Sequence, residues 1–213
     1  MGMTTEFESA DGSVAAPEFR AGLVAVAGRP NVGKSSLVNR LVGQKVSIVT
    51  HKAQTTRHRI AGVASFEQGQ MVLLDTPGLH RQAKKALNRQ MNRTAENTLQ
   101  DADLNLFVVE AGRWTDEDED VKQLVLKSSR PCIALLNKID KVAKKEGLLP
   151  YIEQHFSDEQ FKAVMPISAR TGSGVDAVIE TVMAQLPVGP ALYPEDQISD
   201  RPVRFLCAEL IRE

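Results

Sequence analysis

The sequence has few cysteines, few aromatic residues and no excess of charge of either sign. Its two cysteines among 213 residues, Cys132 and Cys207, are far apart and in apolar surroundings, which excludes a disulfide framework and favours a reducing cytoplasm. The 26 basic and 27 acidic residues argue against a wholly cationic nucleic-acid binder, so no DNA partner is expected. The first twenty residues hold no apolar stretch long enough for a signal peptide or a membrane span.

Short apolar stretches alternate with stretches of helical periodicity after a polar, aperiodic leader over residues 1–20, which is expected to be disordered. We expect strands over 23–28, 59–66, 70–75, 104–110, 132–137 and 163–168, and helices over 34–42, 84–99, 116–127, 145–155 and 175–186. The acidic run 116–120 is expected to be a helix N-terminus. This alternation predicts an α/β fold with a doubly wound, mostly parallel six-stranded sheet, one antiparallel edge strand and ligands at the carboxyl ends of its strands.

The run Gly28-Arg-Pro-Asn-Val-Gly33-Lys34-Ser35 matches G-x-x-x-x-G-K-[ST] and lies between the first expected strand and the first expected helix. Glycines let the backbone wrap around phosphate oxygens, and amides at a helix N-terminus complete an anion site. Lys34 is expected to reach the β- and γ-phosphates, and the Ser35 hydroxyl is expected to bind Mg²⁺. The motif predicts a P-loop NTPase whose nucleotide contacts include Gly28, Arg29, Pro30, Asn31, Val32, Gly33, Lys34, Ser35 and Ser36. A glycine-rich turn without a ligand is the alternative, which the strand–loop–helix context disfavours.

A second element, Asp75-Thr-Pro-Gly78, directly follows an apolar strand. An Asp at this place is typical of a magnesium partner, and Gly78 offers its amide to a γ-phosphate, whereas an ordinary β-turn is the alternative. Within the polar stretch 51–59, Thr56 is expected, in preference to Thr55, to close over Mg²⁺ and the γ-phosphate. The expected metal ligands are therefore Ser35, Thr56 and Asp75.

The run Asn137-Lys138-Ile-Asp140, at the end of an apolar strand, resembles the N-K-x-D element of the GTPase family. The resemblance implies that the Asp140 carboxylate accepts two hydrogen bonds from guanine, which adenine cannot supply. It also implies that the stem of Lys138 lies along the base and that Asn137 ties the base loop to the phosphate loop. Ser168-Ala169-Arg170 is similar to the family's S-A-x element, whose amide meets the guanine O6. The implied nucleotide contacts in these two elements are Asn137, Lys138, Asp140, Ser168, Ala169 and Arg170, beside Asp75 and Gly78. A solvated loop is the alternative for the first element.

These motifs, together with K-A-Q-T-T-R-H-R and F-V-V-E-A-G-R-W-T, resemble the bacterial Era-type GTPases over residues 22–213. The resemblance implies a cytoplasmic switch that binds GTP and hydrolyses it to GDP, and a full-length protein that assists small ribosomal subunit assembly through ribosomal RNA. It also allows peripheral membrane association. We expect a GTPase domain over 21–187, a linker over 188–202 and, over 203–213, the start of a helix leading into a KH RNA-binding domain. That domain's G-x-x-G loop does not occur in the sequence, so RNA binding is not expected for this chain alone.

Leu79 follows the D-x-x-G element, where many switch GTPases have a glutamine that orients the attacking water. Catalysis is then expected to rest on Lys34, Thr56, Gly78 and Asn31. Asn31 is included because relatives with Asn at this position bind K⁺ beside the phosphates, while an Asn that only caps the turn is the alternative. Two other functions stay open, namely a module that senses GTP without hydrolysing it and an ATP-dependent P-loop kinase.

Overall fold

The computed structural model describes residues 18–43, 61–76, 85–143, 145–157, 159 and 161–194. The strands are β1 (Arg20–Ala27), β2 (Ala61–Phe66), β3 (Gly69–Asp75), β4 (Leu104–Glu110), β5 (Cys132–Asn137) and β6 (Phe161–Pro166). The helices are α1 (Lys34–Val42), α2 (Lys85–Asp101), α3 (Asp116–Lys127), α4 (Leu148–Phe156) and α5 (Val175–Gln185), with 3-10 turns at Ile139–Lys141 and Lys145–Gly147. The expected helix over 203–213 lies outside the described residues.

The six strands form one sheet in the order β2-β3-β1-β4-β5-β6. β2 lies at an edge and runs antiparallel to β3, whereas every other neighbouring pair is parallel. β4 and β5 are apolar along most of their length and almost wholly buried, as expected of strands covered on both faces. The predicted doubly wound sheet with one antiparallel edge strand is confirmed.

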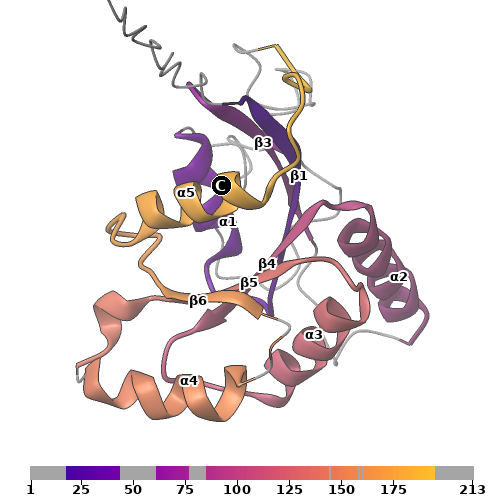
Figure 1. Ribbon diagram of the computed structural model, residues 1–213. Helices are drawn as coiled ribbons and strands as arrows, with labels where there is room; N and C mark the ends of the chain where they lie inside the picture. Colours follow the sequence, from indigo (N-terminus) through magenta and orange to yellow (C-terminus); the bar gives the residue numbers. More distant parts are fainter. Residues whose placement is uncertain are drawn as a thin grey trace, which may run out of the picture.

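Helices cover both faces of the sheet, with α1 and α5 on one face and α2, α3 and α4 on the other (Figure 1). Successive side chains of a strand point to opposite faces, so β1 contributes to two cores. Val24 and Val26 pack in the core under α1 and α5, while Ala25 and Ala27 pack in the core under the other three helices. The loop that follows β1 therefore starts from a strand fixed on both faces. Within the described ranges, none of the helices combines the length and the apolar character needed to cross a membrane.

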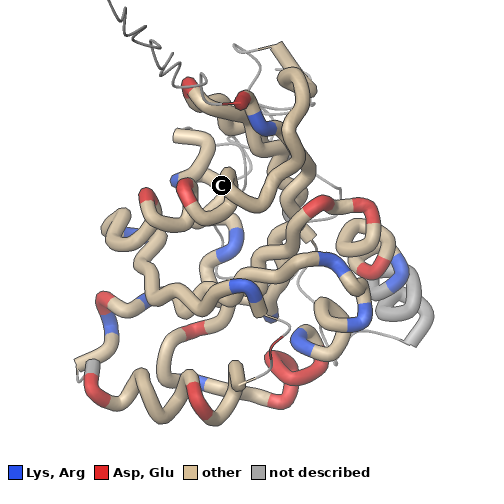
Figure 2. Tube along the Cα trace, viewed as in Figure 1, with Lys and Arg blue, Asp and Glu red and all other residues tan. Residues whose placement is uncertain are grey.

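α3 begins in a capping box. The Thr115 hydroxyl accepts from the Asp118 amide at 3.4 Å, and the Asp118 carboxylate accepts from the Thr115 amide at 3.0 Å. The acidic first turn lies at the positive end of the helix dipole and forms the red run at that end of α3 in Figure 2. The predicted helix N-terminus at the acidic run is confirmed.

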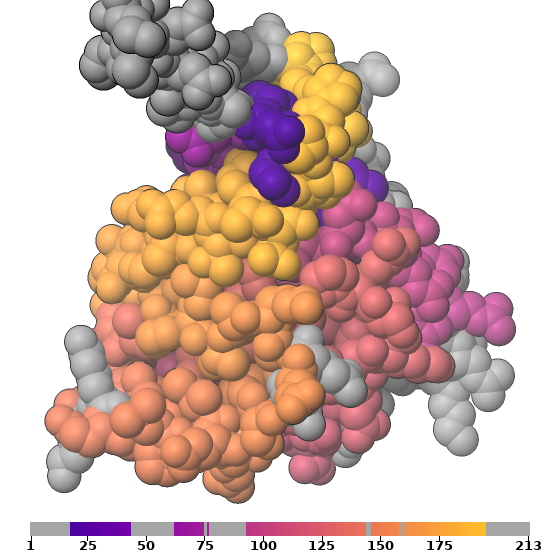
Figure 3. All heavy atoms as spheres, in the orientation of Figure 1, coloured from indigo at the N-terminus to yellow at the C-terminus, as the bar shows by residue number. Residues whose placement is uncertain are grey.

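The segment after α5 returns to the first strand. Figure 3 shows the last described residues, in yellow, against the first ones, in indigo. The Ala21 amide donates to the Pro187 carbonyl at 3.1 Å, and the Gly189 amide donates to the Phe19 carbonyl at 3.0 Å. The first residues of the expected linker, 188–202, are thus paired with the start of the sheet.

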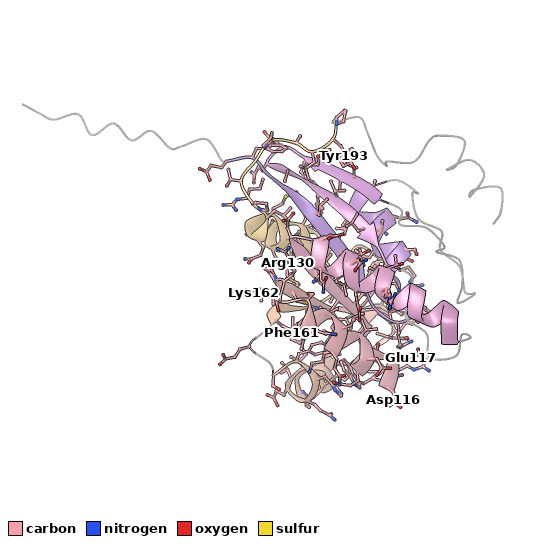
Figure 4. All side chains as sticks on the ribbon, turned by 90° about the vertical axis from the view of Figure 1, so that its right-hand side faces the viewer. Asp116, Glu117, Arg130, Phe161, Lys162 and Tyr193 are labelled. Atoms are coloured by element: carbon pink, nitrogen blue, oxygen red, sulfur yellow. The ribbon has the colours of Figure 1, made fainter. Side chains whose placement is uncertain are left out.

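Gln70, at the start of β3, holds the next part of this segment. Its buried side-chain oxygen accepts from the Leu192 and Tyr193 amides at 2.8 and 2.9 Å, and its amide group donates to the Tyr193 carbonyl at 2.9 Å. Figure 4 places Tyr193 at the opposite end of the molecule from Asp116 and Glu117. Tyr193, near the end of the described residues, therefore lies far from the N-terminus of α3.

Candidate functional site

Loops from neighbouring strands meet at the carboxyl edge of the sheet. The phosphate motif follows β1, Asp75 ends β3 on one side of β1, and Asn137 ends β5, which only β4 separates from β1. From β1 the chain adds β3 and β2 on one side of the sheet and β4, β5 and β6 on the other, so the direction in which strands are added changes between β1 and β4. Open α/β sheets bind ligands at such a switch point, so this edge is the candidate site.

The phosphate loop, residues 28–35, turns through two left-handed backbone positions. Asn31 has φ 63° and Gly33 has φ 102°, and Asn is among the residues that adopt this conformation at least cost. A Cβ on Gly33 would collide with the Asn137 side chain, and a Cβ on Gly28 would collide with the Val108 carbonyl. Both glycines are therefore needed for the close approach of the loop to its neighbours.

Lys34 is buried in the first turn of α1. Its ammonium donates to the carbonyl oxygens of Gly28 and Arg29 at 2.8 and 2.9 Å, so the loop curls around the charged group. The N-terminus of α1 adds its partial positive charge at the same place. Because charge-assisted bonds to phosphate are stronger than those to neutral carbonyls, the loop presents a preformed anion site.

The end of β3 is tied directly to the end of β1. Asp75 pairs with Val26 in the register of these parallel strands. The buried Thr76 donates through its hydroxyl and its amide to the Val26 carbonyl, at 2.7 and 3.3 Å. Sequence reasoning assigned no role to Thr76, although a hydroxyl directly after a buried strand is a signal for such an anchor.

The residues beside the phosphate loop fit a magnesium ion. Ser35 stands in the first turn of α1, and Asp75 is the last residue of β3, the strand next to β1, so two residues of types that supply oxygen ligands stand on elements beside the loop. Mg²⁺ prefers oxygen ligands of this kind and retains several waters. The remaining predicted residues of this half, Thr56, Gly78 and Leu79, lie outside the described residues.

Asn137 joins the phosphate loop to the base loop, residues 137–140. Its buried side-chain amide donates to the Val32 carbonyl at 2.8 Å, and its side-chain oxygen accepts from the Ala169 amide at 2.9 Å. One side chain therefore fixes both the phosphate loop and the S-A-x element to the end of β5. The two predicted halves of the site are brought together in this way.

Asp140 is held by two donors. Its Oδ1 accepts from the Ser168 hydroxyl at 2.6 Å, and its Oδ2 pairs with the exposed Arg170 guanidinium at 2.7 Å. The hydrogen bond from Ser168, aided by the charge of Arg170, lowers the pKa of Asp140 below that of an ordinary aspartate despite some desolvation. The carboxylate is thus ionised at neutral pH and oriented to accept hydrogen bonds.

A partly buried cluster of charged side chains, which the sequence analysis did not predict, joins the two loops. Arg29 donates through Nε to Asp118 Oδ2 at 2.9 Å and through Nη2 to Glu110 Oε2 at 3.2 Å. The Lys138 ammonium lies 3.1 Å from the same Glu110 oxygen. Arg29, which was expected among the phosphate contacts, thus directs its guanidinium to carboxylates. The T-x-x-D spacing of Thr115 and Asp118 signals a helix cap but not this ion pair.

Burial raises the pKa of Glu110, but its hydrogen bonds and charge interactions with Lys138 and Arg29 lower it by more, so the net pKa lies below that of an ordinary glutamate. Glu110 is therefore ionised at neutral pH. The site combines an anion cup, a pair of oxygen donors suited to Mg²⁺ and an oriented carboxylate, which together suit a purine nucleotide with several phosphates.

Known proteins share both the sequence and the fold. Residues 23–138 match the family described as 50S ribosome-binding GTPase. The chain is 49% identical over 192 residues to GTPase Era of Stenotrophomonas maltophilia, which covers 90% of this chain and 64% of that protein. It is 47% identical over 201 residues to GTPase Era of Xanthomonas oryzae pv. oryzae, covering 94% and 67%. The chain thus spans about two thirds of the length of these relatives.

Two solved structures show the same architecture. A variant of Era from Aquifex aeolicus bound to GDP·AlF4⁻ is 40% identical with a TM-score of 0.83, covering 91% of this chain and 66% of that one. An Era in complex with MgGDPNP and nucleotides 1506–1542 of 16S ribosomal RNA is 40% identical with a TM-score of 0.84, covering 92% and 66%. Because residues 23–138 match the family model and the chain is 47% identical to the Xanthomonas oryzae Era over 67% of that protein, this chain belongs to the Era-type GTPases of the 50S ribosome-binding GTPase family.

Proposed function

We propose that this chain binds guanine nucleotides with Mg²⁺ and hydrolyses GTP to GDP and phosphate, acting as a conformational switch. The observation that carries the proposal is the double contact of Asn137, the first residue of the base loop, which ties the phosphate loop and the S-A-x element to that loop as one site. The GDP·AlF4⁻ and MgGDPNP complexes of the two Era structures support it.

In this proposal the triphosphate occupies the loop around Lys34, whose ammonium turns from the carbonyls of Gly28 and Arg29 toward phosphate oxygens. The guanine N1 and N2 groups donate to the ionised Asp140. Adenine has no matching pair of donors, and an unpaired carboxylate costs about 1–3 kcal/mol, so Asp140 favours guanine. In the proposal Lys138 covers the base, and the S-A-x element, which the bond between the Ala169 amide and Asn137 holds beside the base loop, borders the O6 side.

In the proposal Ser35, Asp75 and Thr56 would hold Mg²⁺, which would supply positive charge beside the phosphate oxygens. Leu79 cannot orient water as a glutamine would, so a second positive charge is needed beside the phosphates. We infer that K⁺ supplies it next to Asn31, whose left-handed backbone turns the loop at this point. A turnover rate at least about tenfold higher in KCl than in matched NaCl is expected, consistent with a stabilising charge in the transition state. Equal turnover rates in KCl and NaCl would contradict the role proposed for K⁺.

We also propose that the protein assists small ribosomal subunit assembly through RNA binding, which the Era complex with 16S ribosomal RNA supports. The proposal places the protein in the cytoplasm, and the family resemblance allows peripheral contact with a membrane.

Calorimetric titration with GDP, GTP and ATP, with and without Mg²⁺, tests the ligand. The reaction is tested by phosphate release from GTP, with Lys34→Ala as the deficient variant and Lys162→Ala, an exposed lysine on β6, as the matched control. Lys34→Ala should lose at least about 100-fold in activity because Lys34 touches the phosphates, while Lys162→Ala should match the wild type. Guanine-nucleotide binding without phosphate release would indicate a module that senses GTP, and a preference for ATP would indicate a kinase-type site.

A further inference from the structure

Glu110 comes from the strand that separates the two nucleotide loops. β4 lies between β1, which leads into the phosphate loop, and β5, which leads into the base loop. Glu110 is the last residue of β4 and pairs with Asn137 in the β4–β5 register. A side chain at this place can reach both loops, and none of the predicted nucleotide contacts includes it.

One oxygen of Glu110 holds a cation from each loop. Its Oε2 accepts from Arg29 of the phosphate loop at 3.2 Å and from Lys138 of the base loop at 3.1 Å. The side chains are largely shielded from water, with 19% of Glu110, 22% of Lys138 and 8% of Arg29 exposed. Ion pairs in such surroundings are screened less by salt than surface pairs are.

The two cations depend on Glu110 to different degrees. Arg29 has a second carboxylate partner, Asp118, which is fully buried and also holds the cap of α3. Lys138 has Glu110 as its acidic partner within the described part of the chain. Lys138 also has a left-handed backbone, with φ 67° and ψ 31°, which non-glycine residues adopt at a cost. Loss of the Glu110 charge would therefore release Lys138 while Arg29 stayed held.

We propose that Glu110 is a positioning residue for guanine nucleotides, which fixes the Lys138 side chain where it meets the base and so couples the base loop to the phosphate loop. The inference rests on the proposed function, because it assigns Glu110 a task only if Lys138 contacts a bound base. Since Lys138 acts on the base and not on the γ-phosphate, Glu110 governs affinity and leaves the hydrolysis of bound GTP unchanged.

The test compares Glu110→Gln, which removes the charge and keeps the size, with Glu153→Gln, an exposed glutamate of α4, as the matched control. Dissociation constants are measured by titrating fluorescently labelled GDP, and hydrolysis of bound GTP is measured in single turnovers. Glu110→Gln should weaken GDP binding about five- to tenfold, the range expected for the net contribution of one ordinary hydrogen bond, with single-turnover hydrolysis within about twofold of wild type. Glu153→Gln should match the wild type in both measurements.

A double-mutant cycle with Lys138→Met shows through which residue Glu110 acts. If Glu110 acts through Lys138, Glu110→Gln should change GDP affinity by less than about twofold in the Lys138→Met background. An equal loss in both backgrounds, or wild-type affinity of Glu110→Gln, would overturn the inference. If thermal unfolding shows that Glu110→Gln does not fold, Lys138→Met alone must show the loss in affinity with unchanged single-turnover hydrolysis, and wild-type affinity would reject the idea. A wild-type chain that binds no GDP would instead refute the proposed function.

Discussion

The phosphate loop and the base loop lie at one edge of the same sheet, but different groups shape them. In the phosphate loop the backbone dominates, because carbonyls of Gly28 and Arg29 hold Lys34 and the turn depends on the left-handed Gly33. In the base loop, side chains dominate, because Asn137 and Asp140 make the contacts that define it.

The difference follows from what each loop has to recognise. A phosphate carries oxygens on all sides, so amides and an ammonium in a tight turn suit it whatever the rest of the ligand is. A purine base presents a fixed pattern of donors and acceptors, which only side chains of matching pattern can distinguish. Changes of backbone in the first loop should therefore abolish all nucleotide binding, whereas changes of side chain in the second should have graded effects.

The largest effect is expected from Gly33→Ala. Its φ of 102° is unfavourable for an L side chain, and the added Cβ collides with Asn137, so one substitution disturbs both loops. We expect a loss of at least about 100-fold in GDP affinity, together with about 1–3 kcal/mol of folding stability, because strain at such a site cannot be relieved locally. Fluorescent GDP titration and thermal unfolding measure the two quantities.

Gly43→Ala is the matched control for backbone strain. Gly43 caps α1 with φ 75°, but among the described residues other than its chain neighbours none has an atom within 4 Å of where its Cβ would stand. The variant should lose about 1 kcal/mol of stability from strain alone and keep wild-type GDP affinity. Full nucleotide binding by Gly33→Ala would show that the turn of the phosphate loop is not what forms the anion site.

Asn137→Ala sharpens the comparison at the contact between the loops. The substitution leaves the Val32 carbonyl and the Ala169 amide without their hydrogen-bond partner, and each group that stays buried costs about 1–3 kcal/mol of free energy. Because the two loops are then no longer held together, GDP affinity should fall about 10- to 100-fold. Calorimetry on GDP measures the affinity, and denaturant unfolding measures the stability.

Asn105→Ala separates loss of binding from loss of stability. Asn105 is equally buried near the start of β4, where its amide donates to the Leu99 carbonyl at 3.3 Å and the Ser128 hydroxyl at 2.9 Å. It should lower stability to a similar degree while GDP affinity stays unchanged. If both variants lost affinity equally, Asn137 would matter only for folding.

Most of the fold could be predicted because its signals are local. The bounds of α1, β4, α3 and β5 follow from runs of apolar residues and from helix caps, and they agree with the structure. β1 starts at Arg20, three residues before the expected Leu23, because pairing with Gly69 of β3 extends it beyond the apolar run. α4 starts at Leu148 because a 3-10 turn occupies Lys145–Gly147, a distinction that periodicity does not make.

The candidate site was only partly predictable, because motifs name groups that touch a ligand but not those that hold the motif. Asn137 and Asp140 can be recognised from the N-K-x-D spacing, and the structure places them at the same edge of the sheet as the phosphate loop. Glu110 and Asp118 meet Arg29 across 81 and 89 positions of sequence, and no local pattern indicates which of many acids will do so. The strand order supplies that information, since it sets β4 between the two loops.

Ser168→Ala should give the smallest effect and a distinct pH dependence. Its hydroxyl is the main group that lowers the pKa of Asp140, ahead of Arg170, so removing it should raise that pKa toward the ordinary value. In the proposed function guanine donates to the ionised carboxylate, and a carboxylate with a lowered pKa keeps its charge until the pH falls through that value. GDP affinity should therefore weaken about two- to tenfold at neutral pH, from the lost hydrogen bond, and its decline in acid should begin at a higher pH than in wild type. Titrations of GDP from neutral to acid pH measure this, and the wild-type comparison cancels protonation of the nucleotide itself.

Arg170→Gln should move the decline in the same direction but less, because the guanidinium is exposed and its charge is screened. If GDP affinity of Ser168→Ala declined in acid at the same pH as that of the wild type, guanine binding would not depend on the charge of Asp140. The distinction between a phosphate loop that accepts any phosphate and a base loop that selects guanine would then be wrong for Asp140.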